Sequence, residues 1–442
     1  MYNRLLILLL VHMASNKILK NFSYLGLVQL LNYALPIITI PLVSHALGVE
    51  KIGLINYIYS YLNYFILFVS YSFSWTAIRK QNQINDLNYT FSLVFFSQIL
   101  LFVIAILLFF ASLFFIPDLN KNLVLASISC MAVLGAFFDK NWVYQYKEDL
   151  SLVAIVNVVL KVISLIFIFM FVRQEKDYIL YAFILYGTTV LINLILLLMS
   201  LKKYEIKMRL ISVIHIISFL KEGKVLFFSS VVINLYTTTS ILLLGLYCTD
   251  KDVGLYSAAS KLIDVAKVFA IMPLTQLIYP VVAKKIKENV DEGVFFVKQL
   301  MPLFSLIALV LLIGSVVLGP LFIRILFGQE FLGAINMLWI LSLNLVLVFF
   351  STVFGVLLMV NLGMDNFFFK NQLFVAVLSV FLTLLILPYG AGQTSAIILV
   401  FSEFLITGYQ YYCLKKAGYN LFTLDMFSKK KFLNALKVLR EH

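Results

Sequence analysis

The chain is poor in charged residues and in cysteine. Only 12% of its 442 residues are Asp, Glu, Lys or Arg, whereas 62% are hydrophobic, and the mean hydropathy is +1.01. A soluble domain cannot bury so much apolar surface, so the composition predicts a membrane protein. The three cysteines, Cys130, Cys248 and Cys413, lie in different apolar segments without metal-ligand spacing. We therefore expect neither a disulfide framework nor a metal site.

The chain also lacks the motifs and loops that an enzyme or a nucleotide-driven pump would need. It contains no GxxxxGK[ST] phosphate loop, which excludes a conventional nucleotide-driven pump. The longest loop expected outside the membrane, around 319–334, has about fifteen residues. So short a loop leaves little room for external catalytic groups, which counts against a membrane-embedded polymerase or glycosyltransferase. We predict that the protein is not an enzyme and carries no cofactor.

Long apolar runs account for most of the chain. Twelve of them reach the ~20 residues that a helix needs to cross a hydrocarbon core of ~30 Å. The runs are continuous rather than alternating, so they predict helices and not barrel strands. The fold class is therefore an all-α membrane protein with about twelve transmembrane helices. These spans are roughly 22–46, 53–77, 88–116, 122–138, 151–172, 178–200, 225–247, 253–282, 295–318, 334–360, 371–388 and 391–414.

The net charge of +13 is explained by membrane topology rather than by nucleic-acid binding. If the N-terminus is cytoplasmic, 25 of the 34 Lys and Arg residues fall in cytoplasmic segments and three lie inside the membrane. The remaining six, in external loops, are Lys51, Lys121, Arg173, Lys176, Lys251 and Arg324. Cytoplasmic loops of membrane proteins carry such an excess of basic residues, so both termini are predicted to be cytoplasmic. Membrane lipids are expected partners, and nucleic acid is not.

Five segments organise the chain. Residues 1–20 are a cytoplasmic extension, with translation starting at either Met1 or Met13. Residues 21–200 form an N-lobe of six helices and residues 225–414 a C-lobe of six. The stretch 201–224 between them is basic with an amphipathic centre, and we expect it to be a cytoplasmic linker on the membrane surface. Residues 415–442 form a basic cytoplasmic tail suited to anionic lipid.

A similarity between the two halves is the most informative pattern. Glu50, Lys51 and Gly53 precede one apolar stretch, and a charge pair with Gly254 precedes another 201 residues later. The same offset superimposes two polar stripes with spacing i, i+4, i+7, which is one face of a helix. The stripes are Asn56, Ser60 and Asn63 in the first half and Ser257, Lys261 and Asp264 in the second. Matched polar stripes predict a cavity between two lobes, which is typical of a transporter.

Charged residues inside the spans mark the candidate site, because a charge at mid-bilayer costs about 2.5–3.5 kcal/mol on insertion scales. The five are Lys161, Lys261, Asp264, Lys267 and Glu403. At 1.5 Å per residue, Asp264 lies roughly 16 Å into its span, and it is three residues from both Lys261 and Lys267. One reading is an internal salt bridge that joins helices. We favour a water-filled cavity in which Lys161, Lys261 and Lys267 attract an anion.

Other residues complete the expected site. Arg79, at the inner end of the second span, is a further candidate for substrate binding. Asp264 and Glu403 are candidates for ion coupling, since a buried carboxylate can bind H⁺ or Na⁺. The substrate-binding set also includes two amides and two aromatic rings that could contact a sugar: Asn56, Asn63, Tyr57 and Tyr64. Tyrosine also packs well, so a packing role stays open for the last two.

Four prolines interrupt two of the spans: Pro36, Pro41, Pro273 and Pro280. Each removes a backbone hydrogen bond and can kink its helix. The kinks predict either hinges for lobe movement or static bends, and the sequence leaves both open.

Several stretches resemble a known family in their order and spacing. The N-terminal part reads Lys20-Asn21-Phe22-Ser23-Tyr24, then Ile40-Pro41-Leu42-Val43-Ser44-His45-Ala46-Leu47-Gly48 and Ile52-Gly53. Later stretches are Asn141-Trp142-Val143-Tyr144-Gln145 with Glu148, Val253-Gly254-Leu255-Tyr256-Ser257-Ala258-Ala259-Ser260-Lys261-Leu262, and Leu326-Phe327-Gly328-Gln329-Glu330-Phe331 with Ala334. Together they resemble the Wzx-type flippases of O-antigen and capsular polysaccharide, in the polysaccharide transporter family. Tyr146 departs from the family's frequent Gly after Gln, which puts only the local loop geometry in doubt.

The resemblance implies a fold and a function. The fold would be two six-helix bundles, helices 1–6 and 7–12, as in the multidrug and toxin extruders (a MATE-like fold). The function would be to move an undecaprenyl-diphosphate-linked oligosaccharide across the bacterial inner membrane by alternating access. A polysaccharide polymerase and a chain-length regulator would be further partners. A multidrug exporter of the same fold is the sibling alternative, although its often cationic substrates fit poorly with surplus lysines.

Overall fold

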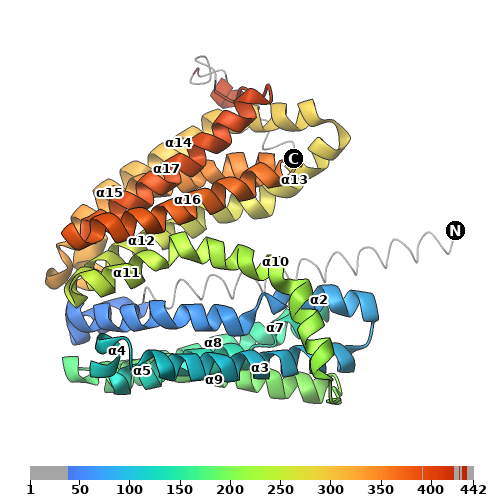
Figure 1. The fold of residues 1–442 in the computed structure, drawn as a ribbon. Coiled ribbons are helices and arrows are strands. Elements are labelled where there is room, and N and C mark those ends of the chain that lie inside the picture. The colour runs from blue at the N-terminus through green and yellow to red at the C-terminus, as the bar shows by residue number, and fades with distance from the viewer. Residues whose placement is uncertain (1–37, 391, 423–427, 429–430, 436–442) are drawn as a thin grey trace. The chain divides into compact units, whose positions relative to one another are not determined.

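The computed structural model describes residues 38–390, 392–422, 428 and 431–435, and these are almost entirely helical (Figure 1). No strand occurs in these ranges, which confirms the predicted all-α class. The extension over 1–20 and most of the first predicted span lie outside the described residues, as does much of the tail. Within the tail, residues 431–435 are helical.

The number of spanning helices differs from the predicted twelve. In the described part of the chain, nine helices are long and apolar enough to cross a membrane, or ten if one bent pair is counted as a span. The bent pair is Val213–Leu235 with Thr239–Tyr247, at an angle of 48°. The count of twelve is thus not confirmed.

Two physical features account for this difference. Residues Ile38–Ile84 count as one helical stretch of 47 residues. At 1.5 Å per residue that is about 70 Å of helix, more than twice the hydrocarbon core, and the stretch is interrupted by the left-handed backbone of Gly48, with φ 72°. Helix α12, Asp250–Pro273, is outside the nine because three charged residues occupy its otherwise apolar centre.

By its internal contacts the chain divides into two compact units. Unit 1 takes in Ile58–Val231 together with the residues up to Lys51. The helix over 38–70 is followed by α2 (Phe73–Ile84), α3 (Leu87–Ser112), α4 (Pro117–Lys121), α5 (Leu123–Ser129), α6 (Met131–Phe138), α7 (Asn141–Tyr146), α8 (Leu150–Phe171), η1 (Glu175–Asp177), α9 (Tyr178–Lys203) and α10 (Val213–Thr237). Helix α9 packs against α5, α6 and α8.

Unit 2 takes in Ile52–Tyr57 and Val232–His442. Its elements are α11 (Thr239–Tyr247), α12, η2 (Leu274–Ile278), α13 (Tyr279–Glu288), α14 (Val290–Phe322), η3 (Ile323–Phe327), η4 (Gln329–Phe331), α15 (Ala334–Ser351), η5 (Thr352–Met359), α16 (Asp365–Ile386), η6 (Leu387–Tyr389) and α17 (Gly392–Lys416). Helix α15 is central, because it contacts α12, α14 and α17, and α16 packs on α17 (Figure 1).

The connection after α9 is short, and the second half of the expected linker is helical. Helix α9 ends at Lys203 and α10 begins at Val213, so only residues 204–212 of the expected linker, 201–224, are non-helical. The early part of α10 is anchored within unit 1. There the Tyr71 hydroxyl donates a hydrogen bond to the Leu220 carbonyl at 3.0 Å, and the Tyr71 ring stacks on Phe227 with centroids 4.5 Å apart. These contacts explain why the amphipathic stretch continues into the spanning helix.

Candidate functional site

The intramembrane charges of unit 2 begin on α12. Its start is fixed by a capping box, in which the Asp252 backbone N–H donates to the Thr249 hydroxyl at 3.2 Å and the Thr249 hydroxyl donates to the Asp252 carboxylate at 2.7 Å. Asp264 lies about four turns beyond this cap. The Lys267 ammonium, one helical turn further along, is 3.4 Å from the Asp264 carboxylate. The Asp264 side chain is 57% exposed and that of Lys267 is 22% exposed.

Glu403 on α17 adds a second carboxylate to this group. It is 6% exposed, it interacts electrostatically with Lys267, and it forms a hydrogen bond with the Ser351 hydroxyl at the end of α15. Three helices therefore meet here, since α15 packs on both α12 and α17. Lys267 is thus paired with Asp264 and is also the cation that acts on Glu403.

Lys261 differs from Lys267 in its partners. Its side chain is half-buried, and it forms no ion pair with any of the residues that the structure describes. The four intramembrane charges of unit 2, two lysines and two carboxylates, sum to zero. The salt-bridge reading thus applies to Lys267 and Asp264, and the formal positive surplus expected from the sequence comes from Lys161.

Lys161 lies on α8 of unit 1, where its side chain is half-buried. One turn before it, the Asn157 amide donates to the Val153 carbonyl of its own helix at 2.8 Å. One turn after it, Ser164 is buried. Asn157, Lys161 and Ser164 therefore follow one another at intervals of about one turn along α8, and the Asn157 amide is partly satisfied by its own helix.

The predicted sugar contacts lie on the helix over 38–70 and have different exposures. Tyr57 is only 2% exposed, so its ring is a packing element in this structure. Asn56, Asn63 and Tyr64 are half-buried and keep part of their side chains accessible. The alternative left open for tyrosine, packing, fits Tyr57 better than a sugar contact does.

Arg79 lies on α2 beside a polar cavity of about 400 Å³ that is lined by Thr76, Arg79, Lys80, Gln83, Phe219 and Glu222. Lys80 forms an ion pair with Glu222 of α10 at 2.9 Å. Arg79 is exposed and forms no ion pair among the described residues. Its guanidinium is thus the cation at this cavity that no carboxylate compensates.

Sequence reasoning missed a buried amide in α15. Asn344 is 1% exposed, and neither its amide nitrogen nor its oxygen has a hydrogen-bond partner among the described atoms. The same holds for Gln410 of α17, which is fully buried. Buried unpaired amides are costly, so each of these two side chains is a candidate contact for a polar group. The only signal for Asn344 in the sequence was a lone amide within an apolar run.

The described residues offer no alternative chemistry based on metal or sulfur. Cys130, Cys248 and Cys413 are free thiols. No group of three His, Cys, Asp or Glu side chains that could hold a metal ion occurs in the described ranges. The chemistry available in these spans is that of ammonium, carboxylate, amide and hydroxyl groups.

Comparison with known proteins places the chain in a family. The family described as "Polysaccharide biosynthesis protein" matches residues 18–286, which is more than half of the chain. The chain belongs to this family. A family relative from Escherichia coli (strain K12), named "Putative O-antigen transporter", is 27% identical over 396 residues, covering 88% of this chain and 94% of that protein. The family assignment confirms the resemblance found in the sequence.

Two solved structures share the fold at 15% identity. One is the lipid II flippase MurJ in an inward closed conformation, with a TM-score of 0.68 over 94% of this chain and 90% of that one. The other is an inward-facing multidrug resistance MATE family transporter of the MOP superfamily, with a TM-score of 0.58 over 90% of this chain and 98% of that one. These similarities confirm the predicted MATE-like fold.

Proposed function

We propose that this protein is a flippase that moves a polyprenyl-diphosphate-linked oligosaccharide across the bacterial inner membrane by alternating access. Three observations support the proposal: the polysaccharide biosynthesis family, a relative named for O-antigen transport, and a fold shared with a lipid II flippase. The named relatives are transporters or flippases, which supports a function without bond making or breaking. The basic bias supports cytoplasmic termini. Outward movement of the cargo is what the resemblance to the Wzx-type flippases implies.

The observation that carries the proposal is Lys261. It is a half-buried cation inside a membrane-spanning segment, and no described carboxylate compensates it. Because an isolated charge inside a bilayer is costly, such a residue is retained where an aqueous cavity or an anionic ligand surrounds it. A diphosphate is a ligand of that kind, and lysine binds phosphate as a point charge. Lys161 of unit 1 is a further cation that we assign to substrate binding.

Ion coupling is assigned to Glu403 in this proposal. Glu403 is nearly fully buried next to Lys267, whereas Asp264 is exposed and already paired with Lys267. A carboxylate in such a dry setting is stabilised when a small cation such as H⁺ or Na⁺ binds to it and compensates its charge. Binding of the ion would release Lys267 from one of its two partners.

Charge reversal at Lys261 tests the proposed function. In a bacterial strain that lacks its own O-antigen flippase, Lys261→Glu should abolish surface display of O-antigen, whereas Lys261→Arg should retain most of it. Lys370→Glu is the matched control, because Lys370 is exposed at the start of α16. Display should be measured by surface antibody staining at equal expression. Normal display by both Lys261 variants would contradict a diphosphate contact there.

A multidrug exporter is the second candidate, because a MATE family transporter shares the fold. The charges argue against it, since the intramembrane residues of unit 2 sum to zero and unit 1 adds Lys161, with no acidic surplus for cationic drugs. The two functions separate in one strain. Restored O-antigen display without increased resistance to cationic drugs supports the flippase, and the opposite result supports the exporter.

A further inference from the structure

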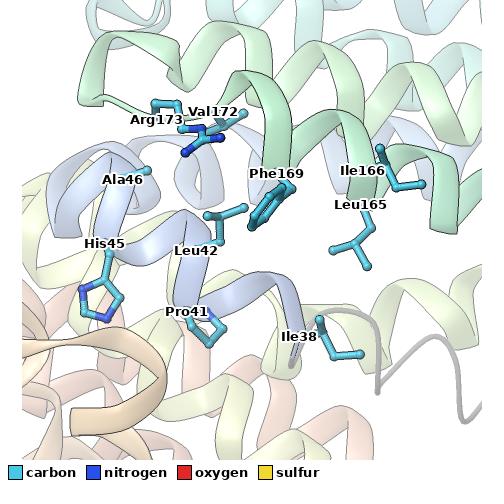
Figure 2. Close-up of a pocket in the computed structure, with 10 residues that line it drawn as sticks. All are labelled: Ile38, Pro41, Leu42, His45, Ala46, Leu165, Ile166, Phe169, Val172 and Arg173. Carbon is cyan, nitrogen blue, oxygen red and sulfur yellow. The ribbon is translucent and has the colours of Figure 1, made fainter.

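A groove in unit 1 is a hollow that the proposed site does not use (Figure 2). Its volume is about 770 Å³, within the ~300–1,000 Å³ typical of ligand pockets. We call it the external groove. It is lined by the helix over 38–70 and by α8 with its C-terminal cap, through Ile38, Pro41, Leu42, His45, Ala46, Leu165, Ile166, Phe169, Val172 and Arg173.

The groove is elongated and apolar. Eight of its ten lining residues are apolar, and the small side chain of Ala46 helps to leave the space open. From Leu165 to Arg173 it follows α8 for eight residues, which is roughly 12 Å at 1.5 Å per residue. Such a shape suits a hydrocarbon chain lying along the helix.

One end of the groove carries a cation. Figure 2 shows Arg173 at that end, close to Val172 and on the side of Leu42 and Ala46. Its guanidinium lies over the Phe169 ring, 5.4 Å from the centroid. Among the described residues it forms no ion pair. The distribution of basic residues predicts that this end of the groove faces the external side of the membrane.

The acidic groups nearest to Arg173 in sequence are already engaged. Glu175 forms an ion pair with Lys51 at 3.6 Å, which fastens η1 to the helix over 38–70. The Asp177 carboxylate accepts hydrogen bonds from the backbone N–H groups of Arg173 and Gln174, at 3.0 and 2.9 Å. The Arg173 guanidinium is therefore left to bind an anion from outside the protein.

We propose that the external groove holds the polyprenyl chain of the lipid carrier, with the carrier's phosphate on Arg173. This inference rests on the proposed function and adds an exit site for the lipid to it. The Arg173 guanidinium lies over the ring of Phe169, which itself lines the groove. A ligand that places its phosphate on Arg173 and its hydrocarbon chain in the groove must therefore have the two parts joined directly, without a polar group between them. A polyprenyl phosphate has that arrangement. A phospholipid places polar glycerol esters between the two. On α8 the lining offers these esters no polar side chain between Leu165 and Val172, and on the facing helix His45 is the polar residue of the lining.

Lipid binding by the purified full-length protein tests the groove. Undecaprenyl phosphate and phosphatidylglycerol are the two probes, titrated separately and read by native mass spectrometry. Ala46→Phe should fill the groove and Arg173→Glu should repel the phosphate, so each should weaken binding of undecaprenyl phosphate by roughly tenfold or more. Arg173→Lys should retain much of the affinity. Binding of phosphatidylglycerol should stay unchanged in all three variants.

Matched controls come from the same helix and from another external arginine. Val162→Phe adds the same ring to an exposed position of α8 outside the groove, and Arg324→Glu reverses an exposed arginine of unit 2. Both should bind undecaprenyl phosphate as the wild type does. Each variant should elute from size exclusion like the wild type, which separates loss of binding from misfolding.

The possible results separate the two proposals. Undiminished binding of undecaprenyl phosphate by Arg173→Glu and Ala46→Phe overturns the groove assignment, as does an equal loss for both lipids, which would indicate a general site for anionic phospholipid. Loss of O-antigen display in Lys261→Glu with intact lipid binding supports separate sites. Normal display in Lys261→Glu and Lys261→Arg would overturn the diphosphate contact and leave the binding result at the groove to stand by itself.

Discussion

The charged residues inside the membrane spans differ mainly in which neighbouring groups compensate their charge. Glu403 is 6% exposed and faces Lys267 and Ser351, so its charge has little water around it. We predict that Glu403→Gln makes transport insensitive to an imposed H⁺ or Na⁺ gradient, because the neutral amide cannot bind and release the ion. Asp264→Asn should keep its gradient response. Transport into sealed vesicles under each gradient measures this, and an unchanged response in Glu403→Gln would assign coupling elsewhere.

Outside the spans, Asp149 precedes α8 and joins it to the end of α9. Its carboxylate accepts hydrogen bonds from the Lys203 ammonium at 2.5 Å and from the Tyr204 hydroxyl at 2.7 Å. Burial by itself raises the pKa of Asp149, but these two hydrogen bonds and the charge of Lys203 outweigh it and hold the pKa below its usual value. A lowered pKa in the folded state stabilises the fold above the unfolded-state pKa, and this stabilisation is lost as the pH falls through the folded-state value.

Asp149→Asn should therefore destabilise the protein at neutral pH and not in acid. We expect a loss of about 1 kcal/mol near pH 7, because the hydrogen bonds to a partly exposed charge are removed. The difference from wild type should shrink as the pH falls below about 4. Thermal unfolding in detergent at several pH values checks this. Asp118→Asn is the control, because the Asp118 carboxylate pairs with the exposed Lys121 at 3.6 Å, and this substitution should change stability less.

At the scale of elements, prolines and caps set the ends of helices. Helix α12 begins at its capping box and ends at Pro273, where a π-helical turn, Leu274–Ile278, follows before Pro280 opens α13. The sequence predicted kinks at these two prolines, and the helix boundaries fall there. By contrast, Pro302 lies inside α14 without ending it. A π-helical turn beside a proline is a better candidate for a hinge than a regular α-helix, because the regular hydrogen-bond pattern changes there.

Pro273→Ala should reduce transport several-fold at normal expression, because an added backbone N–H lets the helix continue through the hinge. Pro302→Ala should transport nearly as the wild type does. O-antigen display at equal expression compares the two. Full activity of Pro273→Ala would show that the break between α12 and α13 is a static bend.

At the scale of the whole molecule, the distribution of basic residues predicts the topology. We expect single cysteines placed at 121 and 176 to react with a membrane-impermeant maleimide in intact spheroplasts. Cysteines at 203 and 370 should react only after permeabilisation. The background should lack Cys130, Cys248 and Cys413, which are free thiols in the described structure. Labelling of positions 203 and 370 in intact spheroplasts would contradict the predicted orientation.

Much of this fold could be predicted from hydropathy alone, because a long apolar run in lipid has only the helix available to it. The spans at 151–172 and 178–200 correspond to α8 and α9 within a few residues. Hydropathy did not predict that α10 begins at Val213, since that start depends on the contacts of Tyr71 with Leu220 and Phe227, which are distant in sequence. Pairings of this kind leave no local pattern.

The sequence by itself determined that this is an all-helical membrane protein and which residues carry charge inside the bilayer. It could not decide which lysine is compensated, because Lys261 and Lys267 are equally spaced on either side of Asp264. Only the tertiary structure decided this, by packing α17 on α12 and α15 so that Glu403 lies near Lys267. The external groove likewise depends on two helices more than 100 residues apart in sequence. Composition determines whether a segment is stable in lipid or in water. Its contacts with segments distant in sequence are determined by packing.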